Sequence, residues 1–473
     1  MLETIVLAVF AVLLMAGSAL GVPLPLTLLA GFALFCGYGL SRGHGVRELA
    51  SFSLAGVRTV SGVLALLAIV GVMAAFWRAA GTIPAIVVLA SRLVSPGALV
   101  VATFLLCCLM SMLMGTAFGT AATMGIICMT LAEAMGANTL LVGGAVLAGS
   151  YFGDRNSPMS SSAALVATLT HTDVFSNVRS MLRTGLVPFA LTCAVYAVAG
   201  LAAPTAAAGA SSFDALSSAF DLGPTCLAPA AVVVGLSLRK VSVKRTLLAA
   251  LAVSVLVCVL EQHVALADLP RIALFGYHAE APEVARLVDG GGLASMANIE
   301  CVVGISATYA GLFDGTGLLR GLRSRIDELN RRTSPFVSVL ATGLATSCIA
   351  CNQTLAIMLT DQLCSGLAGE TREGYALDLE DTVVTCAALM PWSIAATATL
   401  SFIGAPTASI LAACFLYLLP LCSLTSSMLA AHARRAQATT DVRVVRGHGA
   451  AVRLASVSAD AGVRHAHTMA RAA

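Results

Sequence analysis

One stretch of the sequence, residues 149–162, gathers most of the side chains that could do chemistry. It contains a carboxylate, a guanidinium, an amide, a proline and a run of hydroxyls, and it directly follows an apolar run. Asp154, with Asn156, Ser157 and the hydroxyls of Ser160–Ser162 nearby, supplies the hard oxygen ligands that small cations prefer. Because a proton and a cation can compete for one carboxylate, this stretch predicts a site for a small cation at Asp154.

The adjacent Arg155 allows a second interpretation of the same stretch. A guanidinium beside Asp154 can form a structural ion pair, and a carboxylate near a loop can also cap a helix. Polar, glycine- and proline-broken segments at membrane depth are nevertheless tolerated only where they are buried in protein or line a water-filled cavity. We therefore favour a functional site at Asp154 and count Arg155 as a secondary member of it.

Two other polar interruptions occur within apolar runs. Thr116 and Thr120 are four residues apart, which puts both hydroxyls on one helical face. Small residues surround them, so plain helix packing is the alternative. Asn352 and Gln353 interrupt a later run, and amides at such depth need hydrogen-bond partners or a ligand. We expect these four side chains to line the same cavity as Asp154.

A further polar group lies near the end of the apolar sequence. Pro391 interrupts a predicted span and is followed closely by Ser393, which we assign to the cavity because a broken span frees carbonyl groups for a cation. Glu380 and Asp381 precede that span and are secondary candidates. The alternative is that they are ordinary residues at a helix N-terminus, where the helix dipole favours negative charge. Asp361 is also a secondary candidate. The alternative is that it lies near the mouth of the cavity and is simply solvated by water.

The composition predicts an all-α polytopic membrane protein. The 473 residues are 58% hydrophobic and 11% charged, far from the roughly 25% charged residues of a globular domain. Mean hydropathy is +0.91. Continuous apolar runs near the length of a bilayer span favour helices over the alternating segments of a barrel. We expect about ten to twelve transmembrane helices, including broken or re-entrant ones. Examples of the runs are residues 60–76, 185–203, 247–260 and 404–430.

Several function classes are disfavoured by the sequence. The formal net charge is only +3 and the arginines lie in short loops and the tail, so we expect no nucleic-acid partner. The chain lacks the H-E-x-x-H and G-x-S-x-G patterns, so we do not expect an enzyme, although a membrane-embedded one is the third hypothesis. The 14 cysteines lie mostly in apolar runs, and we expect no disulfide framework and no cofactor.

Charge predicts the orientation in the cell membrane. Lys and Arg gather in short connections and in the tail, which the positive-inside rule assigns to the cytoplasm together with both termini. The acidic connections 204–223 and 261–292 are expected outside. The basic connections are residues 41–58, 179–183, 239–245 and 320–332.

Matched polar landmarks indicate an internal duplication. Three pairs of segments follow in the same order, and broken segments at matching places in two halves are the best sequence pointer to a binding site at the membrane midplane. The pairs are residues 71–82 with 304–316, 115–120 with 346–354, and 154–162 with 380–393. We divide the chain into a first transmembrane half (1–203), linking spans with external loops (204–292), a second half (293–432) and a basic, disordered cytoplasmic tail (433–473).

At these residues the sequence resembles the NhaC family of sodium/proton antiporters, within the larger ion-transporter superfamily, over most of residues 1–430. The family's Gly-Thr-x-Trp-Gly-Thr segment is matched by residues 115–120, with Phe118 in the aromatic place. Its Gly-x-Tyr-Phe-Gly-Asp-x-x-Ser-Pro-x-Ser segment is matched by 149–160, and its Leu-Glu-Asp before Pro-Trp by 379–381 and 391–392. The resemblance implies two inverted repeats with broken helices and secondary active transport.

The chain departs from the family pattern at three places. Ser160-Ser161-Ser162-Ala163 stands where many members have Ser-Asp-Thr-Thr, Asn352 replaces an aspartate, and Ser393 replaces an asparagine. Two carboxylates are therefore missing. A less anionic site fits an amino-acid or carboxylate substrate, so a sodium- or proton-coupled carrier or exchanger of an organic acid or amino acid is the alternative function.

The sequence thus predicts a sodium/proton antiporter that works by alternating access. We expect it to transport Na⁺ and H⁺, or a small organic solute, and to lie in the lipid bilayer. A homodimer is one arrangement that the sequence allows. A channel is less favoured because paired broken segments are typical of carriers. Asp154 is the exchanged ligand, and the residues assigned to assist it are Asn156, Ser157, Thr116, Thr120, Asn352, Gln353 and Ser393.

Overall fold

The computed structural model describes residues 2–20, 22–91, 95–203, 219–239, 241–281, 284–285, 288–318, 333–350, 352–365 and 371–429. The chain divides into two units, Met1–Cys422 and Ser423–Ala473. The predicted tail from residue 433 and most of the connections 204–223 and 320–332 lie outside the described residues. Their predicted roles, and the division into two halves with linking spans, remain predictions.

The described elements are helical, which confirms the predicted all-α class. Within these ranges the only β-type pairing is a bridge between Tyr277 and Gly290. A helix satisfies its backbone groups internally, as a segment in lipid must. The elements up to residue 202 are α1 (Leu2–Ala19), α2 (Leu24–Ser41), α3 (Val46–Thr59), α4 (Ser61–Ala79), α5 (Thr82–Ser91), α6 (Pro96–Met114), α7 (Ala117–Thr120), the π-helix η1 (Ala121–Gly125), α8 (Ile126–Ala134), α9 (Thr139–Asn156), α10 (Ser161–Thr170) and α11 (Val174–Ala202).

The second part of the chain also contains both long and short helices. Its elements are η2 (Pro224–Leu227), α13 (Ala228–Leu238), α14 (Val243–Leu260), α15 (Leu269–Phe275), α17 (Leu293–Thr316), α19 (Pro335–Ala350), α20 (Gln353–Cys364), α21 (Arg372–Asp381), α22 (Val383–Cys386), η4 (Ala387–Leu389), α23 (Ile394–Phe402) and η5 (Thr407–Ala412). An apolar helix over Cys414–Leu429 follows.

Fewer helices than expected are long enough to span a membrane alone. Among the described residues seven are long and apolar enough, or up to eight if a bent pair counts as one span. The apolar runs of the sequence predict about ten to twelve. The difference has a physical reason, because polar residues interrupt several of these runs and leave shorter apolar helices of 10–17 residues, such as α10 and α19.

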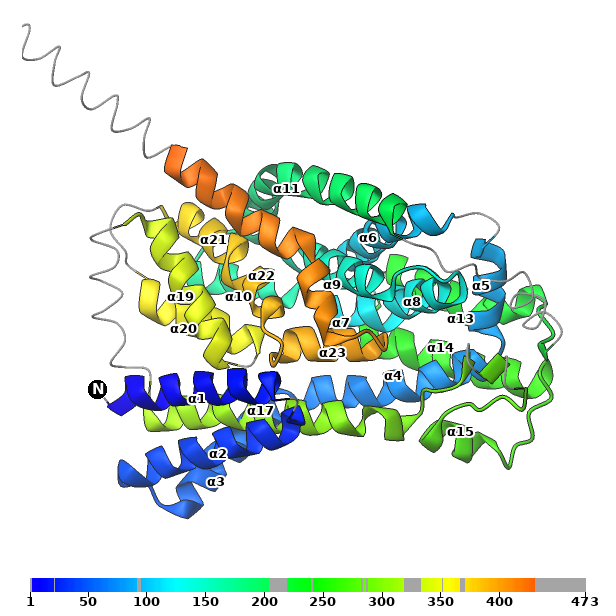
Figure 1. Cartoon of the computed structure of the whole chain (residues 1–473), viewed down its shortest axis with the longest axis horizontal. Coiled ribbons are helices and arrows are strands. Elements are labelled where there is room, and N and C mark those ends of the chain that lie inside the picture. Colours follow the sequence, from blue (N-terminus) through cyan, green and yellow to red (C-terminus); the bar gives the residue numbers. More distant parts are fainter. Residues whose placement is uncertain are drawn as a thin grey trace, which may run out of the picture. The chain divides into compact units, whose positions relative to one another are not determined.

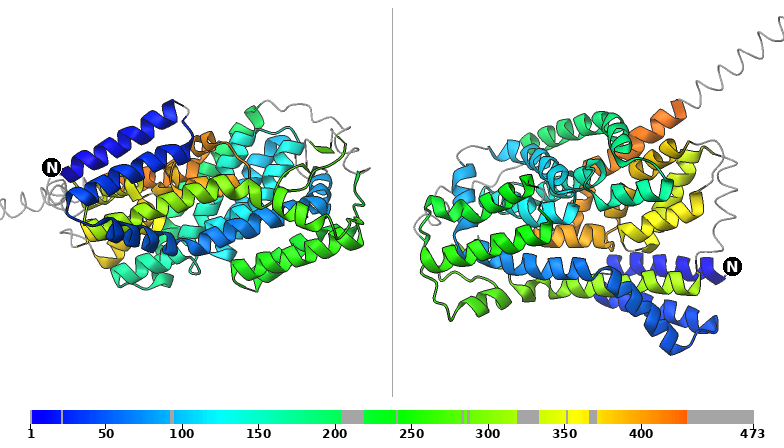
Figure 2. Two further views of the ribbon diagram at one scale, coloured as in Figure 1. Left: turned by 90° about the horizontal axis from the view of Figure 1, so that it is seen from below. Right: turned by 180° about the vertical axis from the view of Figure 1, so that it is seen from behind.

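One side of the Met1–Cys422 unit is a layer built from α1, α2, α3, α4 and α17 (Figure 1; Figure 2 shows the same neighbours from two further directions). Within it α3 and α17 pack backbone against backbone. A Cβ atom added at Gly56 would overlap the carbonyl oxygen of Ala307, and one at Gly311 would overlap that of Phe52. Small residues at these positions therefore permit the close approach, as is common between membrane helices.

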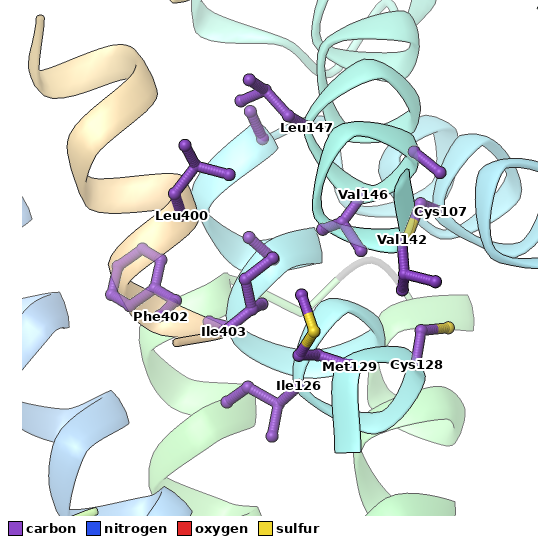
Figure 3. Packing of buried hydrophobic residues seen from close by; sticks show 14 of the residues in the cluster. Cys107, Ile126, Cys128, Met129, Val142, Val146, Leu147, Leu400, Phe402 and Ile403 are labelled. Carbon is purple, nitrogen blue, oxygen red and sulfur yellow. The ribbon is translucent and has the colours of Figure 1, made fainter. Parts of the chain in front are cut away.

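The remaining helices form a second layer around an apolar core. Figure 3 shows Val142 and Val146 of α9 beside Ile126 and Met129 of α8, with Phe402 from the end of α23 close by. All five are buried. Since lipid is as apolar as these side chains, their packing stabilises the layer mainly through van der Waals contact.

Four helix breaks in the second layer form two matched pairs. The run α7–η1–α8 turns back along α6 after Gly115, whose φ is +67°, and α20 turns back along α19. The open end of the hairpin formed by α6 and α7–η1–α8 lies near α5, and the α19–α20 hairpin lies toward the opposite end of the unit (Figure 1). The other pair of breaks separates α9 from α10 and bends Arg372–Leu389 by 60° from Ile394–Phe402. These breaks lie where the sequence indicates matched polar segments, and the inverted repeat itself stays a prediction.

The α3–α17 contact leads to a stability prediction. Gly311→Ala forces the two backbones apart, and overpacking of this kind costs about 1–3 kcal/mol. Gly304→Ala on the same helix is the matched control, because nothing lies within 4 Å of a Cβ atom there. Thermal unfolding in detergent, followed by the size-exclusion profile, should show a lower Tm for the Gly311 variant only. Equal Tm values for both variants would mean that the helices do not need a glycine at this contact.

Candidate functional site

Asp154 lies near the C-terminal end of α9 with only 4% of its surface exposed. Its Oδ1 accepts a hydrogen bond from Ser160 Oγ at 3.1 Å, and its Oδ2 accepts from Ser162 Oγ at 3.2 Å and from Gln353 Nε2 at 3.0 Å. The backbone N–H of Ala117 donates a further hydrogen bond to this carboxylate. Four groups from three different helix breaks therefore bind one buried side chain.

Each break is made by a residue that favours the start of a helix. Thr116 is the N-cap of α7, Ser160 of α10, Asn352 of α20 and Ser393 of α23. The Asn352 side chain accepts the backbone N–H of Leu355 at 2.8 Å. The side chains of Ser160, Asn352 and Ser393 satisfy backbone N–H groups that otherwise lack partners, whereas Thr116 makes no cap hydrogen bond through its side chain. Helix N-termini also favour nearby negative charge. The local sequence thus explains both the breaks and their suitability around a carboxylate.

A cavity of about 1120 Å³ opens beside Asp154 and has two walls. The wall from the broken helices carries most of the polar lining residues together with apolar ones such as Phe118, Leu355 and Ile394. The wall from α3, α4 and α17 is mostly apolar and has the hydroxyl of Thr59. Polar members of the first wall include Thr116, Asp154, Ser161, Asn352, Gln353 and Asp361. Members of the second wall include Ala55, Gly56, Val63, Ala310, Gly311 and Phe313.

Three of the predicted residues lie near Asp154 in sequence or space but do not line this cavity. Asn156 donates through Nδ2 to the carbonyl of Phe152 at 2.8 Å, and Ser157 Oγ donates to the carbonyl of Met112 at 2.9 Å. Thr120 Oγ1 donates to the carbonyl of Thr116 at 3.0 Å. These side chains hold the broken helices in place, and they reach Asp154 only indirectly.

Two other predicted residues lie at the edges of the cavity. Ser393 is 1% exposed and caps α23, so that its neighbours Ile394 and Ala395 form part of the lining. Asp361 lines the cavity two turns along α20 from the Asp154 site, and its Oδ1 accepts a hydrogen bond from Tyr375 at 3.3 Å. Ser393 therefore shapes the cavity without lining it, whereas the side chain of Asp361 lines the cavity.

Arg155 is fully buried and directs its charge away from Asp154. Its guanidinium donates to the Asn156 side chain at 2.8 Å, to the carbonyl of Met181 at 3.0 Å and to Thr184 at 2.8 Å. It also forms a buried salt bridge with Asp381. This ion pair joins α9 to α21, so the two adjacent residues of α9 have different partners.

The comparison with known proteins decides the family. The model of the Na⁺/H⁺ antiporter family matches residues 149–434, which is more than half of the chain. The chain belongs to this family. The predicted resemblance to the NhaC type is confirmed, since Na(+)/H(+) antiporter NhaC proteins are among its relatives.

Named relatives of the chain in this family include exchangers of ions and of organic solutes. The chain is 26% identical to the malate-2H(+)/Na(+)-lactate antiporter of Bacillus subtilis (strain 168), over 76% of its own length and 78% of the relative. It is 25% identical to the Na(+)/H(+) antiporter NhaC of Alkalihalophilus pseudofirmus, over 80% and 84%. It is also 25% identical to the arginine/ornithine antiporter ArcD of Halobacterium salinarum, over 74% and 75%. These similarities establish a transporter.

The structure shows which of the Ser160–Ser162 hydroxyls contact Asp154, and it adds one residue that was not assigned from the sequence. Ser160 and Ser162 donate hydrogen bonds to the Asp154 carboxylate. The added residue is Tyr151, which lines the cavity and donates to the carbonyl of Ala395 at 3.0 Å. The serines were visible as a run of hydroxyls after Pro158, but the sequence does not show which hydroxyl turns back toward α9. The described residues contain no group of three or more His, Cys, Asp or Glu side chains that could hold a metal ion.

The Arg155–Asp381 pair leads to a second stability prediction. Asp381→Asn leaves the guanidinium buried without its counter-charge, and breaking a buried pair in this way costs about 3–5 kcal/mol. Asp268→Asn is the control, because Asp268 pairs with Arg271 at 3.7 Å on the surface, where such pairs contribute about 0–1 kcal/mol. We expect a large loss of Tm in detergent for the first variant only. A Tm like that of the control would show that Arg155 does not depend on Asp381.

Proposed function

We propose that this protein is a secondary active transporter of the cytoplasmic membrane that exchanges Na⁺ for H⁺ by alternating access. The observation that carries the proposal is the buried Asp154 carboxylate at the meeting point of broken helices from distant parts of the chain. Ionisable residues at membrane depth usually mark ion pathways, and broken helices of this kind form the sites of secondary transporters. Membership of the Na⁺/H⁺ antiporter family supports the same conclusion.

The chemistry of exchange follows from the burial of Asp154. An ionised carboxylate that is closed off without a counter-charge costs several kcal/mol, so closure requires either a proton or a cation. A proton makes the side chain neutral. Na⁺ is held by the carboxylate together with the hydroxyl oxygens of Ser160 and Ser162, which are hard oxygen ligands, while Gln353 donates its Nε2–H to the carboxylate. Since only the loaded site closes, inward movement of one ion requires outward movement of the other.

The cavity supports an inward-facing state. It extends along its lining to Thr59, Gly317 and Ser365. Thr59 follows the basic connection 41–58, and Gly317 precedes the arginine-rich residues 320–332, so the positive-inside rule puts this end of the cavity in the cytoplasm. The same rule supports cytoplasmic positions for both chain termini.

The size of the cavity favours a second candidate function. A volume of about 1120 Å³ is far larger than one ion needs and is like that of pockets that hold small organic molecules, about 300–1,000 Å³. Relatives named for malate, lactate, arginine and ornithine support the same possibility. The second candidate is therefore a cation-coupled exchanger of an organic acid or amino acid, with the solute in the cavity beside Asp154.

Asp154→Asn tests the exchange directly. The amide keeps the shape of the side chain but cannot release a proton, so we expect sodium-driven proton movement to disappear. Purified protein in liposomes with a pH-sensitive dye inside provides the measurement, with Na⁺, Li⁺ or K⁺ added outside, and Asp268→Asn is the control. Exchange at the wild-type rate in a folded Asp154→Asn protein would contradict the mechanism. A wild type that ignores every cation in tight vesicles would favour the organic-solute candidate and start a solute screen.

Ser162→Ala tests the hydroxyl ligands of the same site. The variant removes one neutral hydrogen-bonding group from Asp154, worth about 1 kcal/mol, which corresponds to roughly a fivefold rise in the KM for Na⁺. Ser161→Ala is the matched control, because Ser161 lines the cavity but has no hydrogen bond to Asp154 among the described contacts. The rate of exchange against Na⁺ concentration gives both KM values. A Ser162 variant with an unchanged KM would remove this hydroxyl from the ion site.

A further inference from the structure

The cavity beside Asp154 contains a second carboxylate that sodium/proton exchange leaves without a role. Asp361 lies on α20, is half-buried and lines the cavity. The hydroxyl of Tyr375, a neutral group, donates to its Oδ1 at 3.3 Å. No Lys, Arg or His is present among the described residues that line the cavity. Two acidic groups without a described basic one favour a solute that carries positive charge.

The two carboxylates lie near opposite ends of the part of α20 that lines the cavity. Gln353, the first residue of this helix, donates to Asp154 at 3.0 Å, and Asp361 is eight positions further along the chain. At a rise of about 1.5 Å per residue, these positions are about 12 Å apart along the helix axis. The cavity therefore offers one acidic group near each end of a stretch of about this length.

Apolar side chains line the cavity between these two ends. Leu355, Met358 and Leu359 of α20 contribute to this part of the lining, and Val63 and Phe313 contribute from the wall of α3, α4 and α17. Methylene groups gain free energy when they are buried against such side chains. The lining thus changes from acidic to apolar and back to acidic along α20, a pattern that a single sodium ion does not use.

We propose that this cavity binds an alkyl diamine, with one ammonium group at Asp154, the other at Asp361 and the methylene chain between them. Hydrogen bonds from ammonium to carboxylate groups are about 2.8 Å long, so about 6 Å remains between the two nitrogens. A chain of four carbons joins two nitrogens through five bonds of about 1.5 Å, whose zigzag covers about 6 Å. The inference rests on the proposed function, because it takes the cavity beside Asp154 as the transport site.

A diamine matches this lining better than an organic acid or an amino acid does. A dicarboxylate would bring its charges toward two groups of the same sign. An amino acid has a carboxylate for which the described lining provides no basic partner, and a buried charge without a partner is costly. Na⁺ needs only Asp154, so Na⁺ and the diamine compete for this residue while Asp361 serves the diamine alone.

Binding of the four-carbon diamine putrescine to the purified protein in detergent tests the inference. Isothermal titration calorimetry in sodium-free buffer gives its Kd, and n-butylamine, with one ammonium group, and ornithine, with an added carboxylate, are the matched probes. We expect putrescine to bind about tenfold more tightly than n-butylamine, since a hydrogen bond between charged groups is worth about that factor. Ornithine should also bind more weakly than putrescine. Added Na⁺ should raise the Kd of putrescine, because both occupy Asp154.

Asp361→Asn removes one of the two charges and keeps the shape of the side chain. We expect its Kd for putrescine to rise about tenfold, and its Kd for n-butylamine to change far less, because one ammonium group needs only one carboxylate. The matched control is Glu373→Gln. Glu373 is exposed on the first turn of α21 and is not part of the described lining, so this variant should bind putrescine like the wild type.

The outcomes separate this inference from the function on which it rests. Sodium-driven proton movement in a protein that does not bind putrescine, or binds ornithine more tightly, would overturn the inference alone. Putrescine binding that is unchanged in Asp361→Asn would do the same. Binding that depends on Asp361, in a wild type that ignores Na⁺ in tight vesicles, would overturn the sodium exchange instead. If Asp361→Asn does not fold, the wild type decides, because equal Kd values for putrescine and n-butylamine would contradict a second acidic contact.

Discussion

The structure depends on the need to solvate one carboxylate at membrane depth without bulk water. Asp154 meets this need with hydrogen bonds from Ser160, Ser162 and Gln353 and from the backbone of Ala117. An unbroken helix has no free N–H group to offer, so the backbone donor of Ala117 requires a nearby helix start. The three side-chain donors lie at the starts of α10 and α20. The breaks after α6, α9 and α19 are therefore conditions for keeping a charge-bearing group in the interior.

These breaks are tolerated because the other layer of the unit is continuous and tightly packed. The α3–α17 contact brings two backbones together at Gly56 and Gly311, where side chains would keep them apart. Its side toward the cavity is mostly apolar, with Thr59 as a polar member of the lining. A mostly apolar wall has few side chains that could form hydrogen bonds to the broken helices, which suits the relative movement that alternating access requires.

The sequence predicts the breaks better than it predicts their contacts. Polar residue types within apolar runs reveal the interruptions near Thr116, Asp154 and Asn352, because such residues are costly in lipid and are rare there without a function. Side-chain direction depends on where α9 ends. The helix continues through Asn156, and residues two apart lie about 200° apart around a helix, so Asn156 points away from the cavity that Asp154 faces. Local sequence also cannot pair Arg155 with Asp381, which lies 226 residues away.

That distant pair separates two kinds of charge in one small region. Arg155 and Asp381 balance each other and join α9 to α21, two helices that are far apart in the chain. Asp154 has only neutral donors among its described hydrogen-bond partners. A guanidinium bonded directly to Asp154 would supply a counter-charge for its carboxylate. Under the proposed function, the pairing of Arg155 with Asp381 instead leaves the charge of Asp154 to be balanced by the transported ion.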